Sequence, residues 1–241
     1  MDTISVEQTP NENVVDNQLN DMLENLSVSE SELEYINRRI DREVCNDTIA
    51  SLQDINLITE YKNTKSVKSK VAVLLSLLIE NDIEATCANK IIDEYIMNLV
   101  PPGTKGAIKG CKFNKIVERA IRSMELDDSR FEVCFEKQCA QKQTDEIPDW
   151  YVLEKNSGKL IVGMNQLDLW GGGHQINRGS KYLKDNRFNT DTTKLVCVVC
   201  NHIQFKSEKN KAYELFRSGY TTNTLCYIKN VANIINEFFA S

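Results

Sequence analysis

Two apolar runs separated by a short polar turn lie between residues 149 and 167. The first is DWYVLEK and the second is KLIVGMNQL. The segment between them, KNSGK at residues 155–159, is typical of a tight turn, because Asn, Ser and Gly tolerate the backbone angles that turns require. Both runs are rich in the β-branched and aromatic residues that favour strands. The pattern therefore predicts an antiparallel β-hairpin, to which the rest of the fold has to be fitted.

Further strand-like and helix-like runs alternate along the second half of the chain. Besides the hairpin we expect strands at residues 131–138, 194–205 and 222–228. Apolar residues at helical spacing predict helices at residues 111–124, 174–184, 207–217 and 231–239. Strands that alternate with helices in this way are characteristic of α/β proteins. The sequence therefore predicts an α/β fold, with a mixed sheet flanked by helices.

The first hundred residues differ from the rest in composition. Residues 1–30 are rich in Asn, Glu, Gln, Ser and Asp, and we expect them to be a disordered acidic tail. Residues 31–100 carry apolar residues at helical spacing and predict a helical N-terminal subdomain. This region should end at the Pro-Pro-Gly sequence of residues 101–103, since proline cannot continue a helix. Residues 101–241 would then form the main domain.

Charge is distributed unevenly along the chain. The formal net charge is −6, but the first 35 residues contain nine acidic residues and no Lys or Arg. Residues 101–241 contain 21 basic and 16 acidic residues, which gives a net charge of +5. A mildly basic domain behind an acidic tail is compatible with a polyanionic ligand. An ordinary mixed surface with a solvated tail accounts for the same numbers.

Neither a membrane span nor a secretory signal is expected. No apolar run approaches the 18 residues that a transmembrane helix needs. The first ten residues, MDTISVEQTP, have neither the basic start nor the apolar centre of a signal peptide. We therefore expect an intracellular protein that is not secreted, with its eight cysteines present as thiols.

Polar side chains mark the beginning of the first hairpin strand and the end of the second. Asp149 follows Pro148, and a carboxylate at a strand edge is a good ligand for Mg²⁺, which prefers oxygen donors. The second strand ends in Met-Asn-Gln-Leu-Asp at residues 164–168. Because side chains alternate along a strand, Gln166 and Asp168 should point into one site together. Hydrolysis of a phosphodiester needs a metal ion and groups that orient water, which are the residue types found here.

At these residues the chain resembles the PD-(D/E)XK nuclease superfamily, specifically type II restriction endonuclease-like proteins of bacteria and large DNA viruses. The resemblance extends from residues 101–121 through 146–152 to 162–183, a span of about a third of the chain. In that superfamily the PD acid and an acid on the next strand bind Mg²⁺. A Lys, Gln or Asn two residues after the second acid positions the attacking water, and an acid from a preceding helix often joins the site. The resemblance implies a restriction-endonuclease-like fold with Mg²⁺ as cofactor.

Carried over to this chain, the resemblance makes Asp149 the PD acid, Gln166 the water-positioning residue and Glu118 the helix acid. The chain departs from the pattern at the second acid, because the residue two before Gln166 is Met164. In the other register Asn165 takes the water-positioning place, and Gly163 takes the place of the acid. The second metal carboxylate would then come from Glu118 or Asp168, or it is missing.

Two glycine-containing segments carry candidate DNA contacts. Residues 171–173 are three glycines that could bring a helix N-terminus up to a phosphate. Amides and cations follow them, and amides suit adenine whereas Arg suits guanine. The second segment, residues 103–110, could likewise cradle a phosphate. A flexible loop before a solvated helix, and a plain interdomain loop, explain the same patterns. The candidate DNA-binding residues are Gln175, Asn177, Arg178, Lys181, Lys105 and Lys109.

These features predict a Mg²⁺-dependent, site-specific endonuclease that hydrolyses double-stranded DNA. By the resemblance it would act as a homodimer on a palindromic site, and a companion DNA methyltransferase is a possible partner. The alternatives are a DNA-binding protein on a nuclease fold that has lost cleavage, and a structural or interaction protein. The helices of residues 31–100 would serve as a scaffold or as a module for dimerisation or DNA positioning.

Overall fold

A five-stranded mixed sheet forms the centre of the protein in the computed structural model, which describes residues 30–53, 57–185 and 187–241. The strands lie in the sheet in their order along the chain. The first three pair antiparallel, and the last two add in parallel. The prediction of an α/β fold with a mixed sheet is confirmed. The strands are β1 (Phe131–Phe135), β2 (Trp150–Glu154), β3 (Leu160–Gln166), β4 (Thr193–Val199) and β5 (Leu225–Tyr227).

The predicted hairpin is formed by β2 and β3. Trp150 lies opposite Gly163 and Leu153 opposite Leu160, in antiparallel register. The turn contains Gly158 at a φ of 73°, a left-handed backbone angle that glycine adopts without strain. β3 then pairs in parallel with β4, so the hairpin is joined to the rest of the sheet through its second strand. This arrangement puts β3 in the middle of the sheet, where every residue from Leu160 to Asn165 is buried.

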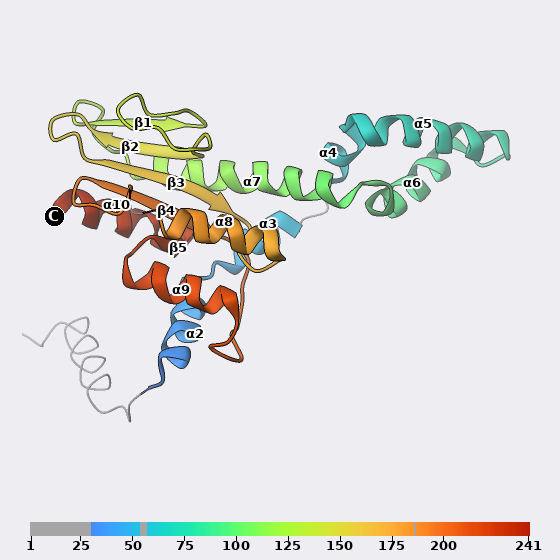
Figure 1. The fold of residues 1–241 in the computed structure, drawn as a ribbon. Coiled ribbons are helices and arrows are strands. Elements are labelled where there is room, and N and C mark those ends of the chain that lie inside the picture. Colours follow the sequence, from blue (N-terminus) through green and yellow to red (C-terminus); the bar gives the residue numbers. More distant parts are fainter. Residues whose placement is uncertain (1–29, 54–56, 186) are drawn as a thin grey trace, which may run out of the picture.

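Helices cover both faces of the sheet (Figure 1). On one face α7 (Pro102–Arg122) and α10 (Val231–Ala240) bury apolar residues against the sheet, together with Leu52 of α3 (Asn46–Gln53). On the other face lie α2 (Glu32–Glu43), α8 (Gly173–Leu183) and α9 (Lys211–Thr221). A short 3₁₀ turn, η1 (Ile228–Asn230), leads from β5 into α10. The body of the protein is thus a three-layer structure with two apolar interfaces.

α7 begins nine residues before the helix that the sequence predicts. It runs without a break from Pro102 through Gly103, Gly106 and Gly110. Pro102 at the helix start is compatible with a helix, because the first N–H has no intrahelical partner. Farther along, Phe113, Val117 and Ile121 are buried against the sheet, and this packing outweighs the low helix propensity of glycine. The prediction of a phosphate-cradling loop at residues 103–110 is therefore wrong.

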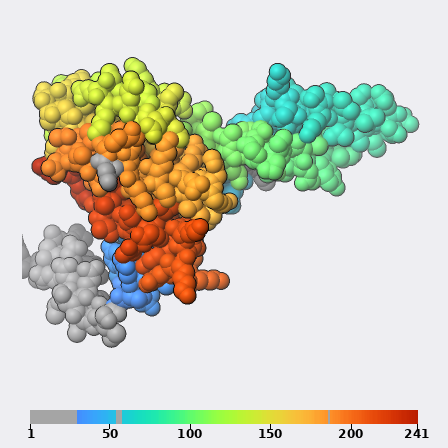
Figure 2. Space-filling view, in the orientation of Figure 1, coloured from blue at the N-terminus to red at the C-terminus, as the bar shows by residue number. Residues whose placement is uncertain are grey.

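The helices of residues 31–100 do not form one unit. α2 and α3 belong to the body, because Ile36, Ile40 and Leu52 are buried in its two apolar clusters. α4 (Leu57–Asn63), α5 (Lys65–Glu80) and α6 (Ala85–Leu99) instead share a small core of their own with the start of α7. We call these three helices the arm. The arm extends away from the sheet at the N-terminal end of α7 (Figures 1 and 2).

Local capping explains where α2 begins. The Ser31 hydroxyl accepts a hydrogen bond from the Glu34 backbone N–H, and the Glu34 carboxylate accepts one from the Ser31 N–H. This reciprocal capping box satisfies two backbone donors at the helix start. The predicted acidic tail lies outside the described residues apart from Glu30, which pairs with Arg38. No helix in the described ranges is long and apolar enough to cross a bilayer.

Candidate functional site

A cleft of about 610 Å³ opens where the end of β3, the first half of α7, α8 and the segment before β2 meet. Its walls combine the glycine face of α7 with polar side chains from the other three elements. It is the place where most of the predicted site residues come together. The lining residues that carry the argument are Gly106, Gly110, Asn114, Glu146, Asp149, Asn165, Gln166, Asp168, Gln175 and Arg178.

Asp149 is held in the cleft by two amide groups. Its Oδ1 accepts a hydrogen bond of 2.6 Å from Asn114 Nδ2, on α7. Its Oδ2 accepts one of 2.6 Å from the backbone N–H of Asn165, on β3. The backbone N–H of Asp149 donates to Gly163 O, which ties the residue to the hairpin. The sheet and α7 therefore fix both oxygens of this carboxylate.

Burial acts against ionisation of Asp149. The pKa of its carboxyl is raised above the ordinary value of 3.8, chiefly because the site removes it from water. The hydrogen bonds from Asn165 and Asn114 act in the opposite direction, because they stabilise the charged form. Burial prevails, and Glu136 adds a smaller repulsion. A carboxylate whose charge is incompletely compensated by its protein neighbours would gain from a nearby cation.

Asn165 is the β3 residue whose backbone N–H holds Asp149 and whose side chain contacts α7. Its Nδ2 donates to Asn114 Oδ1 at 3.1 Å, and its Oδ1 accepts from Trp150 Nε1 at 3.1 Å. Asn165 is buried, so this network gives partners to polar atoms that would otherwise be costly to bury. Gly163 and Asn165 thus lie on the face of β3 that meets Trp150 and α7.

Trp150 explains why the place of the acid in this register is a glycine. A Cβ on Gly163 would lie 1.8 Å from Trp150 Cε2, which is far inside van der Waals contact. The fully buried indole therefore occupies the space that any side chain at position 163 would need. A metal-binding carboxylate at residue 163 is sterically excluded as long as Trp150 is present.

The other register does not supply the acid either. Met164 is only 3% exposed and lies in the apolar cluster on the α8 and α9 face of the sheet. Gln166, at the end of β3, lines the cleft but makes no direct contact with Asp149 among the described hydrogen bonds. Asp168 also lines the cleft, and its Oδ1 accepts a hydrogen bond of 2.7 Å from the Gly171 N–H. Asp168 thus holds the loop before α8.

Glu118 does not join the site. It lies one helical turn beyond Asn114 and forms an ion pair of 2.7 Å with Arg122 on the same helix. It lines a separate groove beside α4, together with Glu60 and Lys115, and not the cleft. The expectation that Glu118 is a catalytic and metal-binding acid is therefore wrong, because α7 presents Asn114 to Asp149 in its place.

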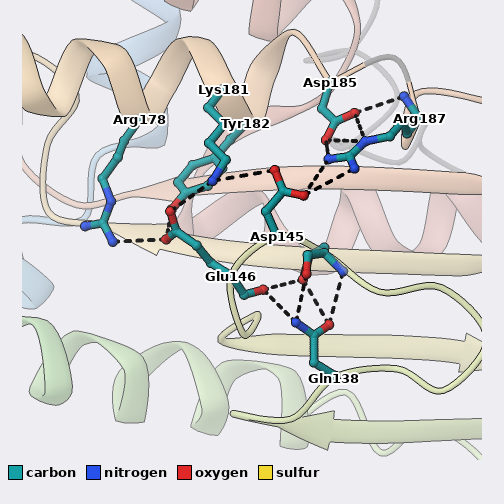
Figure 3. Close-up of polar contacts among 9 residues, drawn as sticks. Gln138, Asp145, Glu146, Arg178, Lys181, Tyr182, Asp185 and Arg187 are labelled. Carbon is teal, nitrogen blue, oxygen red and sulfur yellow. Dashed lines mark hydrogen bonds and ion pairs between the residues drawn. The ribbon is translucent and has the colours of Figure 1, made fainter.

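The predicted DNA-contacting cations of α8 are engaged by an acid from the loop before β2 (Figure 3). Glu146 accepts hydrogen bonds from Arg178 at 3.1 Å, Lys181 at 3.2 Å and the Tyr182 hydroxyl at 2.7 Å. The Tyr182 hydrogen bond is the largest cause of the lowered pKa of Glu146, and the two cations add to it. Asp145 pairs with Lys181 and Arg187, which extends the network along the loop.

The other residues that the sequence predicts to contact DNA lie partly in the cleft and partly outside it. Gln175 lines the cleft, and its Oε1 is buried without a hydrogen-bond partner among the described residues. Asn177 is exposed on α8. Lys105 and Lys109 lie off the glycine face of α7, and Lys109 lines a different hollow, beside Leu52 and His202. Neither lysine belongs to a phosphate-binding loop.

Sequence reasoning missed Asn114 and Glu146. Asn114 lies four residues before Glu118 and thus on the same side of the helix. Because the prediction required an acidic residue, it selected Glu118, one helical turn too late. Glu146 lies three residues before Asp149 in a segment that reads as a loop. Its only signal in the sequence is the pair of cations on the following helix, with no spacing that links them.

Comparisons with known proteins give no function for this chain, so the function has to be inferred from the cleft. No family model, no curated protein and no solved structure matches the chain. In the described part of the chain, no three His, Cys, Asp or Glu side chains are grouped in a way that could hold a metal ion. The cleft instead offers the half-buried carboxylate of Asp149, which two amide groups hold, with Glu146 and Asp168 also on its walls.

Proposed function

We propose that this protein is a Mg²⁺-dependent endonuclease on a restriction-endonuclease-like fold that hydrolyses double-stranded DNA at specific sites. The observation that carries the proposal is the fixed position of Asp149. Its carboxylate is held in a polar cleft, at the start of one hairpin strand and beside the end of the next. This is where the resemblance to PD-(D/E)XK nucleases expects the metal-binding acid. The glycine face of α7 leaves one wall of the cleft open to a phosphate backbone.

The residues present fit a magnesium ion that arrives together with its substrate. Mg²⁺ keeps several of its waters and is commonly bound by one or two carboxylates plus substrate phosphates. Asp149 would be the first ligand, and Asp168 on the same cleft would be the second. When bound, the ion would polarise the phosphate and activate a water molecule. A raised pKa of Asp149 also agrees with a site that gains from a cation.

The chain's own side chains would orient water and DNA. Asn165 is fixed by Trp150 and Asn114 next to Asp149, so its amide would position water with Gln166 at the cleft wall. Arg178 and Lys181 would bind phosphates once DNA displaces them from Glu146. Gln175 and Asn177 would read bases through their amides. Cleavage of a palindromic site would engage a homodimer, and a companion methyltransferase would protect the cell's own DNA.

A second candidate is a protein that binds DNA without cutting it. Met164 and Gly163 occupy the two possible places of the second acid on β3, and Trp150 excludes a carboxylate from one of them. With Glu118 outside the cleft, the site has fewer carboxylates than the resemblance implies. This arrangement favours binding without hydrolysis, in which Asp149 would only hold Asn114 and Asn165 in place.

The two candidates are separated by a cleavage assay with a matched control. Unmethylated plasmid DNA would be incubated with the wild type, Asp149→Asn and Asp128→Asn, in Mg²⁺ and in Mn²⁺. Asp128 is exposed on a loop away from the cleft, so its variant controls for the loss of one carboxylate. Discrete bands with the wild type and Asp128→Asn, but not with Asp149→Asn, would support the nuclease.

DNA binding by all three proteins without cleavage would support the second candidate. Electrophoretic mobility shifts of a labelled duplex at low and high salt would measure it, because phosphate contacts make affinity depend on salt. If neither cleavage nor salt-dependent binding occurs, both candidates fail, and the remaining class is a structural or interaction protein.

A further inference from the structure

The arm exposes an unusually apolar helix. Residues 71–79 of α5 read VAVLLSLLI, in which Ser76 is the one polar residue. A helix that is apolar on all sides is normally buried. In α5, however, Val67 is the only buried residue. Five of the seven exposed large apolar side chains in the described part of the protein lie on α5 and α6: Val73, Leu77, Ile79, Tyr95 and Met97.

An exposed side of α5 carries a regular stripe of four residues. α5 packs on α6 through the side that contains Val67 and Val71, in the small core of the arm. Beside this contact, on the exposed part of α5, Lys70, Val73, Leu77 and Glu80 follow one another at spacings of three, four and three residues. Lys70 lies at the edge nearest α6, where its Nζ also donates to Leu99 O at 3.5 Å. Such alternating spacing lines up side chains along one seam of a helix, as in coiled coils. Val73 is 59% exposed and Leu77 is 49% exposed.

The stripe is complementary to itself in the antiparallel direction. Its pattern is basic, apolar, apolar, acidic, and its centre lies at residue 75. When a second copy of α5 is laid alongside in reverse, Lys70 comes opposite Glu80 of that copy and Val73 comes opposite Leu77. Both apolar residues are then covered, and both charges meet an opposite charge. A two-fold axis produces this kind of isologous contact, in which each pair occurs twice.

We propose that the arm is a dimerisation surface whose occupant is a second copy of this chain, with the two α5 helices antiparallel. Together with α6 of each copy they would form a four-helix bundle. The arm stands clear of the body, so two copies can approach along α5 without a collision between their sheets (Figures 1 and 2). The proposal rests on the arm alone and does not depend on the nuclease proposal.

The mass of the full-length protein in solution is the first test. Sedimentation velocity should give about 55 kDa for the wild type, twice the 27.5 kDa of one chain. Leu77→Glu should give a monomer, because it puts two carboxylates into the centre of the apolar contact. Leu77 is half-exposed in one copy, so the variant should keep its helical circular dichroism. Tyr35→Glu, at an apolar position of α2 in the body that is 41% exposed, should remain a dimer.

A charge exchange tests the antiparallel register. Lys70 and Glu80 lie ten residues apart on one helix, about 15 Å, too far to pair within a chain. Lys70→Glu alone and Glu80→Lys alone should each weaken the dimer about tenfold in dissociation constant, since like charges then face each other twice. The double variant Lys70→Glu with Glu80→Lys should restore the wild-type constant.

Three outcomes would overturn the proposal. A monomeric wild type would mean that the arm binds something else, such as the N-terminal segment of the same chain or DNA. A dimer that Leu77→Glu leaves intact would place the contact elsewhere. A double charge variant that is as weak as the single variants would exclude the antiparallel pairing.

Discussion

The indole of Trp150 fills the space over Gly163 on the neighbouring strand, where an added Cβ would lie 1.8 Å from Trp150 Cε2. The two residues are direct partners in the β2–β3 register, so neither can move away without disturbing the hairpin. The same indole donates its N–H to Asn165, two residues farther along β3. The indole thus fixes the orientation of the Asn165 amide and excludes a carboxylate from position 163.

Gly163→Ala should destabilise the protein. The added methyl group has to displace a fully buried ring, and overpacking of this kind costs about 1–3 kcal/mol. Urea denaturation followed by tryptophan fluorescence would show a lower midpoint. Gly106→Ala is the matched control, because a Cβ there meets nothing within 4 Å and the position is helical. That control should gain about 0.5–1 kcal/mol. Equal midpoints for the two variants would contradict the steric account.

Asn114→Asp should make the stability of the protein depend on magnesium. The substitution puts a second carboxylate within hydrogen-bond distance of Asp149, since the native Asn114 Nδ2 lies 2.6 Å from Asp149 Oδ1. Without metal the two like charges repel each other, which should lower the melting temperature. Mg²⁺ should then raise the melting temperature more in this variant than in the wild type, by preferential binding to the folded state.

The control for this prediction is the double variant Asn114→Asp with Asp149→Asn, which has one carboxylate again. Its response to Mg²⁺ should be close to that of the wild type. Identical Mg²⁺ responses in the single variant and the wild type would show that the space beside Asp149 does not admit the ion.

Glu146→Gln should strengthen the binding of duplex DNA. It removes the charge that holds Arg178 and Lys181, and both cations then become available to phosphates. Each new phosphate contact steepens the dependence of log affinity on log salt by about 0.9. Fluorescence anisotropy of a labelled duplex over a salt series would measure affinity and slope. Glu214→Gln, which breaks a comparable pair with Arg217 on α9, is the control. An equal effect of the two substitutions would speak for a change in net charge alone.

The same substitution should change the pH dependence of stability. The pKa of Glu146 is lowered in the folded protein from its ordinary value of 4.5. A carboxyl with a lowered folded pKa contributes stability that is fully present above its ordinary pKa of 4.5. This contribution is lost as the pH falls through the folded pKa. The wild type should therefore melt at a higher temperature than Glu146→Gln at neutral pH, and the difference should shrink in acid. A difference that stays constant with pH would exclude the carboxylate as its source.

The hairpin and the alternating elements could be predicted because their signals are local. The KNSGK turn and the apolar runs beside it determine β2 and β3 by residue type and spacing alone. α7 could not be predicted in full, since its glycines favour a loop by local propensity, and the packing of Phe113 and Val117 against distant strands decides otherwise. Tertiary contacts of this kind leave no trace in a local pattern.

The candidate site was predicted in outline, and its partners were not. Asp149 and Asn165 come together as the strand pattern indicates, because β2 and β3 are adjacent in sequence. The choice between Asn165 and Gln166 depends on which face of β3 meets α7, and the alternation of side chains alone does not say that. The replacement of Glu118 by Asn114 depends on a shift of one helical turn, which only the packing of α7 determines.

Because α7 is one continuous helix, it connects the arm directly to the cleft. Ile108, near the start of the helix, contacts the core of the arm, and Phe113 packs on the sheet. Asn114 projects from the same helix into the cleft. One residue inserted between Ile108 and Phe113 would turn the arm by about 100° around the helix axis and move it by about 1.5 Å. The number of residues in α7 between Ile108 and Phe113 therefore determines the direction in which the arm points from the cleft.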